Sequence, residues 1–285
     1  MKRTLAMAQG LARALAIVSL VMIGATILVR FAPGYFSDVR ELDARYANTE
    51  REQLAQEAER SKALTPLLVR EIAGWLHGDA GVSRQFGVPV LDLLRPRIAV
   101  TGGLLVRAVV LAWALALTAS FVALGTKHSQ SIWHVPANIL LAIPTAAMAT
   151  VCLFLNWGGA VTVMALLLAA RDFKFVHRSL RKTWSEPWLL QARAQGIRFR
   201  RLVVAHVLPA MVTQLAALAS LSIVTALSAL VPVEVIFDVP GLGKLAWNAA
   251  LNRDLPVLLA VTLLMAVAVA LSGYTPTDRS GLERA

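Results

Sequence analysis

The chain has 285 residues, of which 57% are apolar and 16% are charged, with a formal net charge of +11 and a mean hydropathy of +0.64. Soluble domains carry about 25% charged residues, so this composition excludes an ordinary soluble domain as well as a disordered chain. Cys152 is the single cysteine, which excludes an intramolecular disulfide framework and a cysteine metal cage. We therefore predict an all-α integral membrane protein.

Six apolar segments are candidates for transmembrane helices, because a hydrocarbon core of about 30 Å needs about 20 helical residues. In chain order they cover residues 11–29, 104–125, 137–155, 158–170, 210–231 and 255–274. The fourth segment is short, and it needs residues from the amphipathic stretch after Arg171 to cross a bilayer. The sequence thus predicts six transmembrane helices.

The positions of the basic residues predict the orientation of these helices, since Lys and Arg in short loops stay on the cytoplasmic side. With the N-terminus inside, the cytoplasmic segments carry the whole net charge of +11. Both termini are therefore expected in the cytoplasm, and the lipid bilayer rather than nucleic acid accounts for the basic charge. Residues 1–29 also fit a cleaved signal peptide, but the many spans favour a retained helix.

Between the first two spans, residues 31–100 form a predicted periplasmic helical segment. Glu and Arg alternate over residues 43–62 as on a solvated helix, and apolar residues recur with helical spacing over residues 67–76. The second helix is expected to lie on the membrane surface or against the spans. Residues 78–83 end it as a turn, in which Ser83 is interpreted as a turn residue.

The sequence lacks the motifs of an enzyme. The nearest string to a phosphate loop is 241–245, but Asp238 stands at its first glycine position and Leu245 at its hydroxyl position. The five histidines form no metal-binding pair, and no serine has the surroundings of a nucleophile. An intramembrane enzyme would need a paired base inside a span, which is not visible. We predict no catalysis, no ATP hydrolysis by this chain, no cofactor and no metal.

A long cytoplasmic loop is predicted at residues 171–207, between the fourth and fifth spans. Ser185 is expected to cap a helix whose first turn Pro187 favours. This helix is expected to continue to Gly196, where glycine can adopt the left-handed conformation. A second, basic helix is expected over residues 197–207. Ala192 and Gly196 are four residues apart and would share a face that another protein could approach closely. An amphipathic loop on anionic lipid explains the same pattern equally well.

This loop resembles a known family. The string Ala192-Arg193-Ala194-Gln195-Gly196, followed by Leu208-Pro209, is similar to the cytoplasmic "EAA" loop of binding-protein-dependent ABC importer permeases, in the form found in dipeptide, oligopeptide and nickel permeases. Leu190 stands where the family has a glutamate. Further similar strings occur in chain order at residues 30–34, 78–83, 89–90, 97–101 and 143–144.

A second segment carries the same resemblance after the fifth span. Glu234, Phe237, Pro240, Gly241 and Gly243 match the family's E-x-x-F-x-x-P-G-L-G pattern, and Arg253-Asp254 begins its R-D-x-P string. A carboxylate at the membrane edge is costly unless it is paired or hydrated. The Pro-Gly turn could return the loop into the periplasmic mouth as a gate, and a plain structural turn is an equal alternative.

The resemblance implies a permease subunit of an ATP-driven importer in the bacterial inner membrane. It implies an N-terminal helix within residues 1–30, a five-helix permease core over residues 101–274 and a cytoplasmic tail at 275–285. The implied partners are two ABC ATPases on the cytoplasmic loop, a second permease subunit and a periplasmic solute-binding protein. The expected solute is small, in the first place a peptide and alternatively a nickel chelate or a sugar-like molecule, and it would cross by alternating access. The sixth span lacks the family's usual ending, so a degenerate or non-transporting membrane scaffold is the alternative.

Overall fold

The computed structural model describes residues 80–125 and 129–272, together with isolated helical positions among the first 74 residues. Within this part the regular elements are helices, apart from one isolated bridge between Val82 and Pro89. The all-α prediction is therefore confirmed for the part that is described. The predicted first span, both periplasmic helices and the tail at 275–285 fall essentially outside the described residues.

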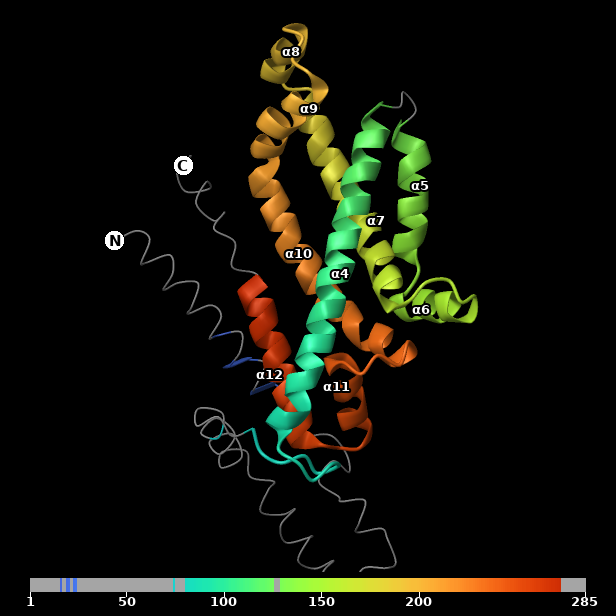
Figure 1. Cartoon of the computed structure of the whole chain (residues 1–285), viewed down its shortest axis with the longest axis vertical. Coiled ribbons are helices and arrows are strands. Elements are labelled where there is room, and N and C mark those ends of the chain that lie inside the picture. Colours follow the sequence, from blue (N-terminus) through green and yellow to red (C-terminus); the bar gives the residue numbers. More distant parts are fainter. Residues whose placement is uncertain are drawn as a thin grey trace, which may run out of the picture. The chain divides into compact units, whose positions relative to one another are not determined.

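Figure 1 shows the helices in chain order, coloured along the sequence. They are α4 (Val90–Gly125), α5 (Ser129–Ala142), α6 (Thr145–Phe154), α7 (Ala160–Trp184), α8 (Pro187–Ala194), α9 (Phe199–Leu202), a π-helical turn η2 (Val203–Val207), α10 (Leu208–Ile236), α11 (Leu242–Leu251) and α12 (Leu255–Ser272).

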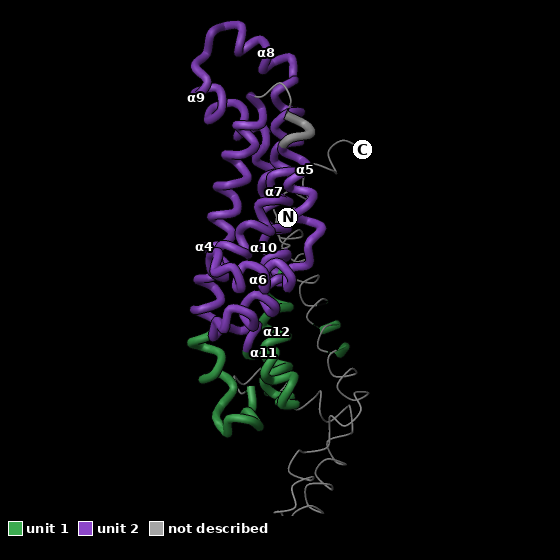
Figure 2. The backbone as a smooth tube through the Cα atoms, turned by 90° about the vertical axis from the view of Figure 1, so that its right-hand side faces the viewer, with its two compact units in different colours: residues 1–97, 245–270 green, residues 98–244, 271–285 purple. Residues whose placement is uncertain are grey.

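The chain divides into two compact units, which Figure 2 colours separately. Unit 1 comprises residues 1–97 and 245–270, and unit 2 comprises residues 98–244 and 271–285. The core of unit 2 lies where α4, α7 and α10 pack together. Alanines dominate this contact, with Ala108, Ala165 and Ala226 among its buried residues. Small side chains allow membrane helices to approach closely, which explains the alanine-rich sequence of these segments.

Three helical stretches among the described residues are long and apolar enough to cross a membrane. They are α4, the continuous stretch Phe199–Ile236 and α12, and a bent pair of helices makes a fourth if it counts as one span. The predicted spans at 104–125, 210–231 and 255–274 correspond to these three stretches. The structure starts α4 fourteen residues earlier than predicted, at Val90.

The predicted third span at 137–155 is not one straight helix. It consists of the end of α5 and the whole of α6, which meet at an angle of 99°. Pro144 causes the break, because it has no N–H to donate and disfavours helical geometry in the residue before it. Pro144 itself adopts φ −58° and ψ 140°, which is an extended conformation.

The predicted fourth span at 158–170 occupies only the first half of α7, which continues to Trp184. The helix therefore continues past Arg171, as the short fourth segment requires in order to cross a bilayer. The start of the cytoplasmic loop at Arg171 stays a prediction. Charged residues in the second half of α7 explain why it is not among the three apolar stretches.

Candidate functional site

The segment between α7 and α10, residues 185–209, is here called the docking segment, after the contact with an ATPase that the family resemblance leads us to expect there. Its first helix, α8, starts at Pro187 as predicted, but Glu186 rather than Ser185 is the residue before it. The predicted capping role of Ser185 is wrong. Its hydroxyl instead donates to the carbonyl of Lys182 at 2.9 Å, at the end of α7. The extended conformation of Glu186 suits the residue before a proline.

Gly196 turns the chain after α8, as the sequence predicted. Its φ angle is +73°, in the left-handed region that glycine adopts without steric penalty. Its N–H donates to the carbonyl of Arg193 at 3.0 Å, which satisfies one of the free carbonyls at the helix end. The docking segment thus reverses direction at a defined glycine.

The second predicted helix, at 197–207, is not a separate element. It consists of the four-residue α9 and the π-helical turn η2, which join α10 directly in a continuous helical stretch Phe199–Ile236. Pro209 lies near the start of α10. Because π turns occur often at functional sites, the π turn at this junction favours a functional role for the docking segment. Figure 1 shows α8 and α9 at the end of unit 2 where α7 finishes and α10 begins.

The inner side of the docking segment packs on the protein's own core. Leu189 and Ala192 are buried in a cluster with residues of α7, α9, η2 and α10. Ala192 therefore does not present a face with Gly196, and that expectation is wrong. The spacing of two residues on a helix does not indicate which side of that helix faces the core. The exposed residues of the family string are Arg193, Ala194, Gln195 and Gly196. Beside them Leu190, at the family's glutamate position, is 50% exposed.

Aromatic side chains connect the docking segment to α4 and α7. The guanidinium of Arg193 lies over the ring of Trp184, 5.0 Å from its centroid. The Trp184 ring lies 5.9 Å from that of Phe199, which meets Phe121 of α4 edge to face at 6.4 Å. These distances allow cation–π and aromatic attraction. Arg193 is therefore held by its own chain.

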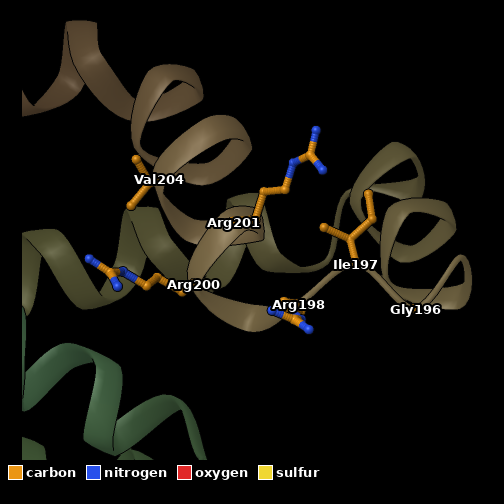
Figure 3. A pocket seen from close by; sticks show the side chains of 6 residues that line it. All are labelled: Gly196, Ile197, Arg198, Arg200, Arg201 and Val204. Carbon is orange, nitrogen blue, oxygen red and sulfur yellow. The ribbon is translucent and has the colours of Figure 1, made fainter.

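Beyond Gly196 the docking segment contains an open hollow of about 680 Å³, shown in Figure 3. It is lined by Gly196, Ile197, Arg198, Arg200, Arg201 and Val204. Among the described residues, none of its three arginines forms an ion pair. Their side chains point in different directions in Figure 3. The surface next to α8 is therefore strongly basic and suits an acidic partner surface.

Glu234 is the centre of a buried polar cluster in unit 2. Its side chain is fully buried, and Thr101 Oγ1 donates to its Oε1 at 2.7 Å. The N–H groups of Gly243 and Lys244 donate to its Oε2 at 2.7 Å and 3.2 Å. The Leu242 N–H donates to Thr101 Oγ1 at 2.8 Å. Together they satisfy the first N–H groups of α11, where a negative charge is favourable.

The two glycines of the family pattern make this cluster possible. A Cβ atom on Gly241 would lie 2.1 Å from Glu234 Oε1, and a Cβ atom on Gly243 would lie 2.9 Å from the Cα of Val231. Neither distance is allowed, so only glycine fits at these two positions. Phe237 packs against the core of α6 and α7, while Pro240 is exposed. Hydrogen bonds from neutral donors, rather than an ion pair, thus compensate the buried Glu234 carboxylate.

Asp254 forms a similar cluster in unit 1. Its fully buried carboxylate accepts a hydrogen bond from Ser83 Oγ and from the N–H groups of Arg84 and Gln85, both at 3.2 Å. Asp254 also stands directly before α12, and its carbonyl accepts the Leu258 N–H at 3.0 Å. Arg253 next to it has a φ of +55°. The turn at Ser83 is thus fixed to the start of α12.

Two residues of these clusters were missed by sequence reasoning. The sequence identifies Thr101 only as part of a string similar to the family, and Ser83 only as a turn residue. Each bonds a carboxylate more than 130 residues away in the sequence, so local patterns could not pair them. The available signal was that all four residues, the two donors and the two carboxylates, lie in strings that are similar to the family.

Comparison with known proteins gives consistent matches. The profile of the family described as binding-protein-dependent transport system inner membrane component matches residues 130–275, more than half of the chain. The oligopeptide transport system permease protein AppB of Bacillus subtilis (strain 168) is 24% identical over 283 residues, covering 87% of this chain and 89% of that protein. The oligopeptide transport system permease protein OppB of Escherichia coli (strain K12) is 26% identical, covering 66% and 69%. The metal-staphylopine import system permease protein CntB of Staphylococcus aureus (strain Mu50) is 35% identical over 107 residues, 38% of this chain and 34% of that protein.

Proposed function

We propose a function for this chain from one premise: it belongs to the family of inner-membrane components of binding-protein-dependent transport systems. It is therefore a multi-pass permease component of an ABC importer in the inner membrane, and it has no catalytic activity of its own. The proposal is that it moves a peptide into the cell by alternating access. Two of the relatives are named as oligopeptide permeases, which supports this solute class.

The proposed assembly follows the family. Two ABC ATPases, a second permease subunit and a periplasmic binding protein would act with this chain, which would have six transmembrane helices and both termini in the cytoplasm. The five-helix core would cover residues 101–274, after an N-terminal helix within 1–30 and a periplasmic segment at 31–100. The tail at 275–285 would be cytoplasmic.

The ATPases would dock on the exposed part of the docking segment, around Arg193, Ala194, Gln195 and Gly196. One observation carries this proposal: the segment continues without interruption into the helical stretch Phe199–Ile236. A displacement at Phe199 would therefore move α10 as a lever, while Leu208 and Pro209 mark the point where the lever enters the membrane. Alternating access needs such an element with two discrete packings.

The clusters at Glu234 and Asp254 would serve as parts of a periplasmic gate. Glu234 holds the N-terminus of α11 through its hydrogen bonds to Gly243 and Lys244. Asp254 holds the turn at Ser83 next to α12. Each carboxylate fixes the start of a helix, so a rearrangement that breaks its bonds would release that helix in one step.

Docking is tested with two substitutions at Gly196. Gly196→Arg places a bulky side chain at φ +73° on the exposed surface. In a pull-down with the permease, it should abolish recovery of the cognate ATPase, and it should abolish the stimulation of ATP hydrolysis by the permease. Gly196→Ala, which strains the turn but adds little bulk, should retain part of both. Gln85→Arg, an exposed position in unit 1, is the matched control and should bind normally. Equal ATPase recovery with wild type and Gly196→Arg would refute docking at this site.

A further inference from the structure

One face of α7 carries a stripe of five cations. At 3.6 residues per turn, they fall within an arc of about 100° around the helix. The five residues are Arg171, Lys174, Arg178, Arg181 and Lys182. The opposite face of the same helix is buried, with Asp172, Val176 and Leu180 among its residues. The second half of α7 is thus divided into a packed side and a cationic side.

The stripe starts deep within the protein's apolar layer. Ser222 Oγ of α10 lies 2.9 Å from both carboxylate oxygens of Asp172 and donates to them, and Arg171 donates to Thr225 Oγ1. Between His206 and Glu234, α10 has no titratable residue. At 1.5 Å per residue this stretch is about 40 Å long, and Ser222 lies about 3 Å from its centre. Thr225, the partner of Arg171, lies about 8 Å from that centre, so Arg171 is well inside the apolar layer.

The remaining cations continue from this level toward the docking segment. With the same rise per residue, Lys174 lies about 5 Å and Arg178 about 10 Å along the helix from Arg171. Both are within the hydrocarbon layer, whose half-thickness is about 15 Å. Arg181 and Lys182 lie near its edge, where long side chains can reach the lipid headgroups. Arg171 is too deep for that.

Among the described residues, a single carboxylate, that of Asp172, lies close to a cation of this stripe. Arg171 has one nearby acid, Asp172, at 3.5 Å, and its side chain is 26% exposed. Lys174 donates to a neutral acceptor, Asn138 Oδ1, at 2.7 Å. In residues 80–125 and 129–272, Arg178 and Lys182 form no ion pair and no side-chain hydrogen bond. Unpaired cations at this depth do not face lipid, because they are stable there only beside water or an anion.

We propose that this face of α7 lines the cytoplasmic half of a water-filled translocation path and binds a carboxylate of the solute. Resting on the peptide import proposed above, that group is the C-terminal carboxylate of the peptide. Arg171 offers a guanidinium fixed by Asp172 and Thr225, and such groups bind carboxylates well. Lys174 and Arg178 follow as successive positions along the path. Asp172 is a positioning residue, because it is fully buried and does not reach the path.

The path itself is tested by thiol labelling, independently of any transported solute. Cys152 is replaced by Ser, and Arg178→Cys supplies one thiol in the complete importer in lipid nanodiscs. The thiol is reacted with a sulfonate-bearing and with a trimethylammonium-bearing methanethiosulfonate reagent. At each thiol the measured quantity is the ratio of the reaction rate of the anionic reagent to that of the cationic reagent. Because of the remaining cations, this ratio should be about tenfold higher at residue 178 than at Trp157→Cys. Trp157 is exposed and lies in a turn distant in sequence from charged residues.

Each result of this experiment decides the proposal. A tenfold preference for the anion that falls when Arg171→Gln is added supports a wet, cationic path. Failure of both reagents to react at residue 178 would show that lipid or protein covers this face and would overturn it. A ratio equal to that of the control would overturn it as well.

The solute group is tested by uptake in proteoliposomes containing the complete importer. A peptide with a free C-terminal carboxylate and the same peptide as its C-terminal amide are compared. Arg178→Gln should raise the KM for the free acid about tenfold and leave that for the amide unchanged. Equal effects on both peptides, or wild-type uptake that does not distinguish them, would overturn carboxylate binding while leaving peptide import intact. Loss of ATPase docking would instead abolish uptake of both peptides.

Discussion

At the scale of single residues, the two buried carboxylates determine where helices start. Glu234 accepts hydrogen bonds from the backbone of Gly243 and Lys244 and from Thr101, and Asp254 accepts them from the turn at Ser83. A buried carboxylate without such partners would be strongly unfavourable. The residues around each carboxylate must therefore either donate a hydrogen bond to it or be small enough for the carboxylate oxygens to reach the backbone N–H groups.

Gly241→Ala tests this requirement directly. The new Cβ atom would lie 2.1 Å from Glu234 Oε1, so the carboxylate must leave the N-terminus of α11. We expect the free energy of unfolding to fall by about 2–4 kcal/mol, because buried hydrogen bonds to a charged group are lost. The measurement is thermal unfolding of the purified chain in detergent, followed by a thiol-reactive dye at the buried Cys152.

Gly102→Ala is the matched control for this experiment. Gly102 lies in α4 next to Thr101, and a Cβ atom there would meet nothing within 4 Å. Alanine should leave the stability unchanged or raise it by up to about 1 kcal/mol, since it favours helix more than glycine does. If both variants unfolded at the same temperature as wild type, the proposed role of Gly241 would be wrong.

At the scale of elements, the docking segment is attached to the membrane helices by a small number of side chains. Leu189 and Ala192 are buried beneath α8, and the Trp184 ring lies between Arg193 and Phe199. This arrangement connects α8 to the end of α7 and to the start of the long α10 stretch. A movement of α8 would then be transmitted to both helices together.

Replacing Trp184 should weaken this transmission while leaving docking itself intact. Trp184→Ala removes a cation–π contact and an aromatic contact, together worth about 1–3 kcal/mol. We expect the stimulation of ATP hydrolysis by the permease to fall about fivefold, with ATPase recovery unchanged. Trp184→Phe should restore most of it.

The control for this prediction is Trp157→Ala, an exposed tryptophan outside the docking segment. It should leave the stimulation unchanged. A Trp184→Ala variant that stimulates ATP hydrolysis as well as wild type would show that the aromatic contacts do not carry the movement.

Sequence patterns predicted the elements well where local chemistry decides them. The left-handed turn at Gly196, the start of α8 at Pro187 and the apolar helices followed from local rules. The predictions failed where the direction of a side chain depends on packing, as for the buried Ala192. Pro144 is a local signal for the bend, but the length of the apolar segment 137–155 favoured a single span in the prediction.

At the scale of the whole molecule, the family and the membrane location could be predicted from the order of several strings along the chain. The polar contact within α7 could not be predicted, because charged residues such as Arg171 and Asp172 after an apolar run are typical of the end of a span. Their hydrogen bonds to Thr225 and Ser222 depend on how α7 packs on α10, which a single sequence does not reveal. The structure thus adds a polar contact at a depth where the sequence indicated a loop.

The central claim is that this permease works with ATPases and a second permease in one importer. The most direct test is purification from native membranes in mild detergent, with mass spectrometry of the proteins that accompany the chain. The account predicts recovery of an ABC ATPase together with a second permease subunit, either a paralogue or another copy of this chain. Recovery of the chain alone, or with unrelated proteins, would contradict it and favour a non-transporting membrane scaffold.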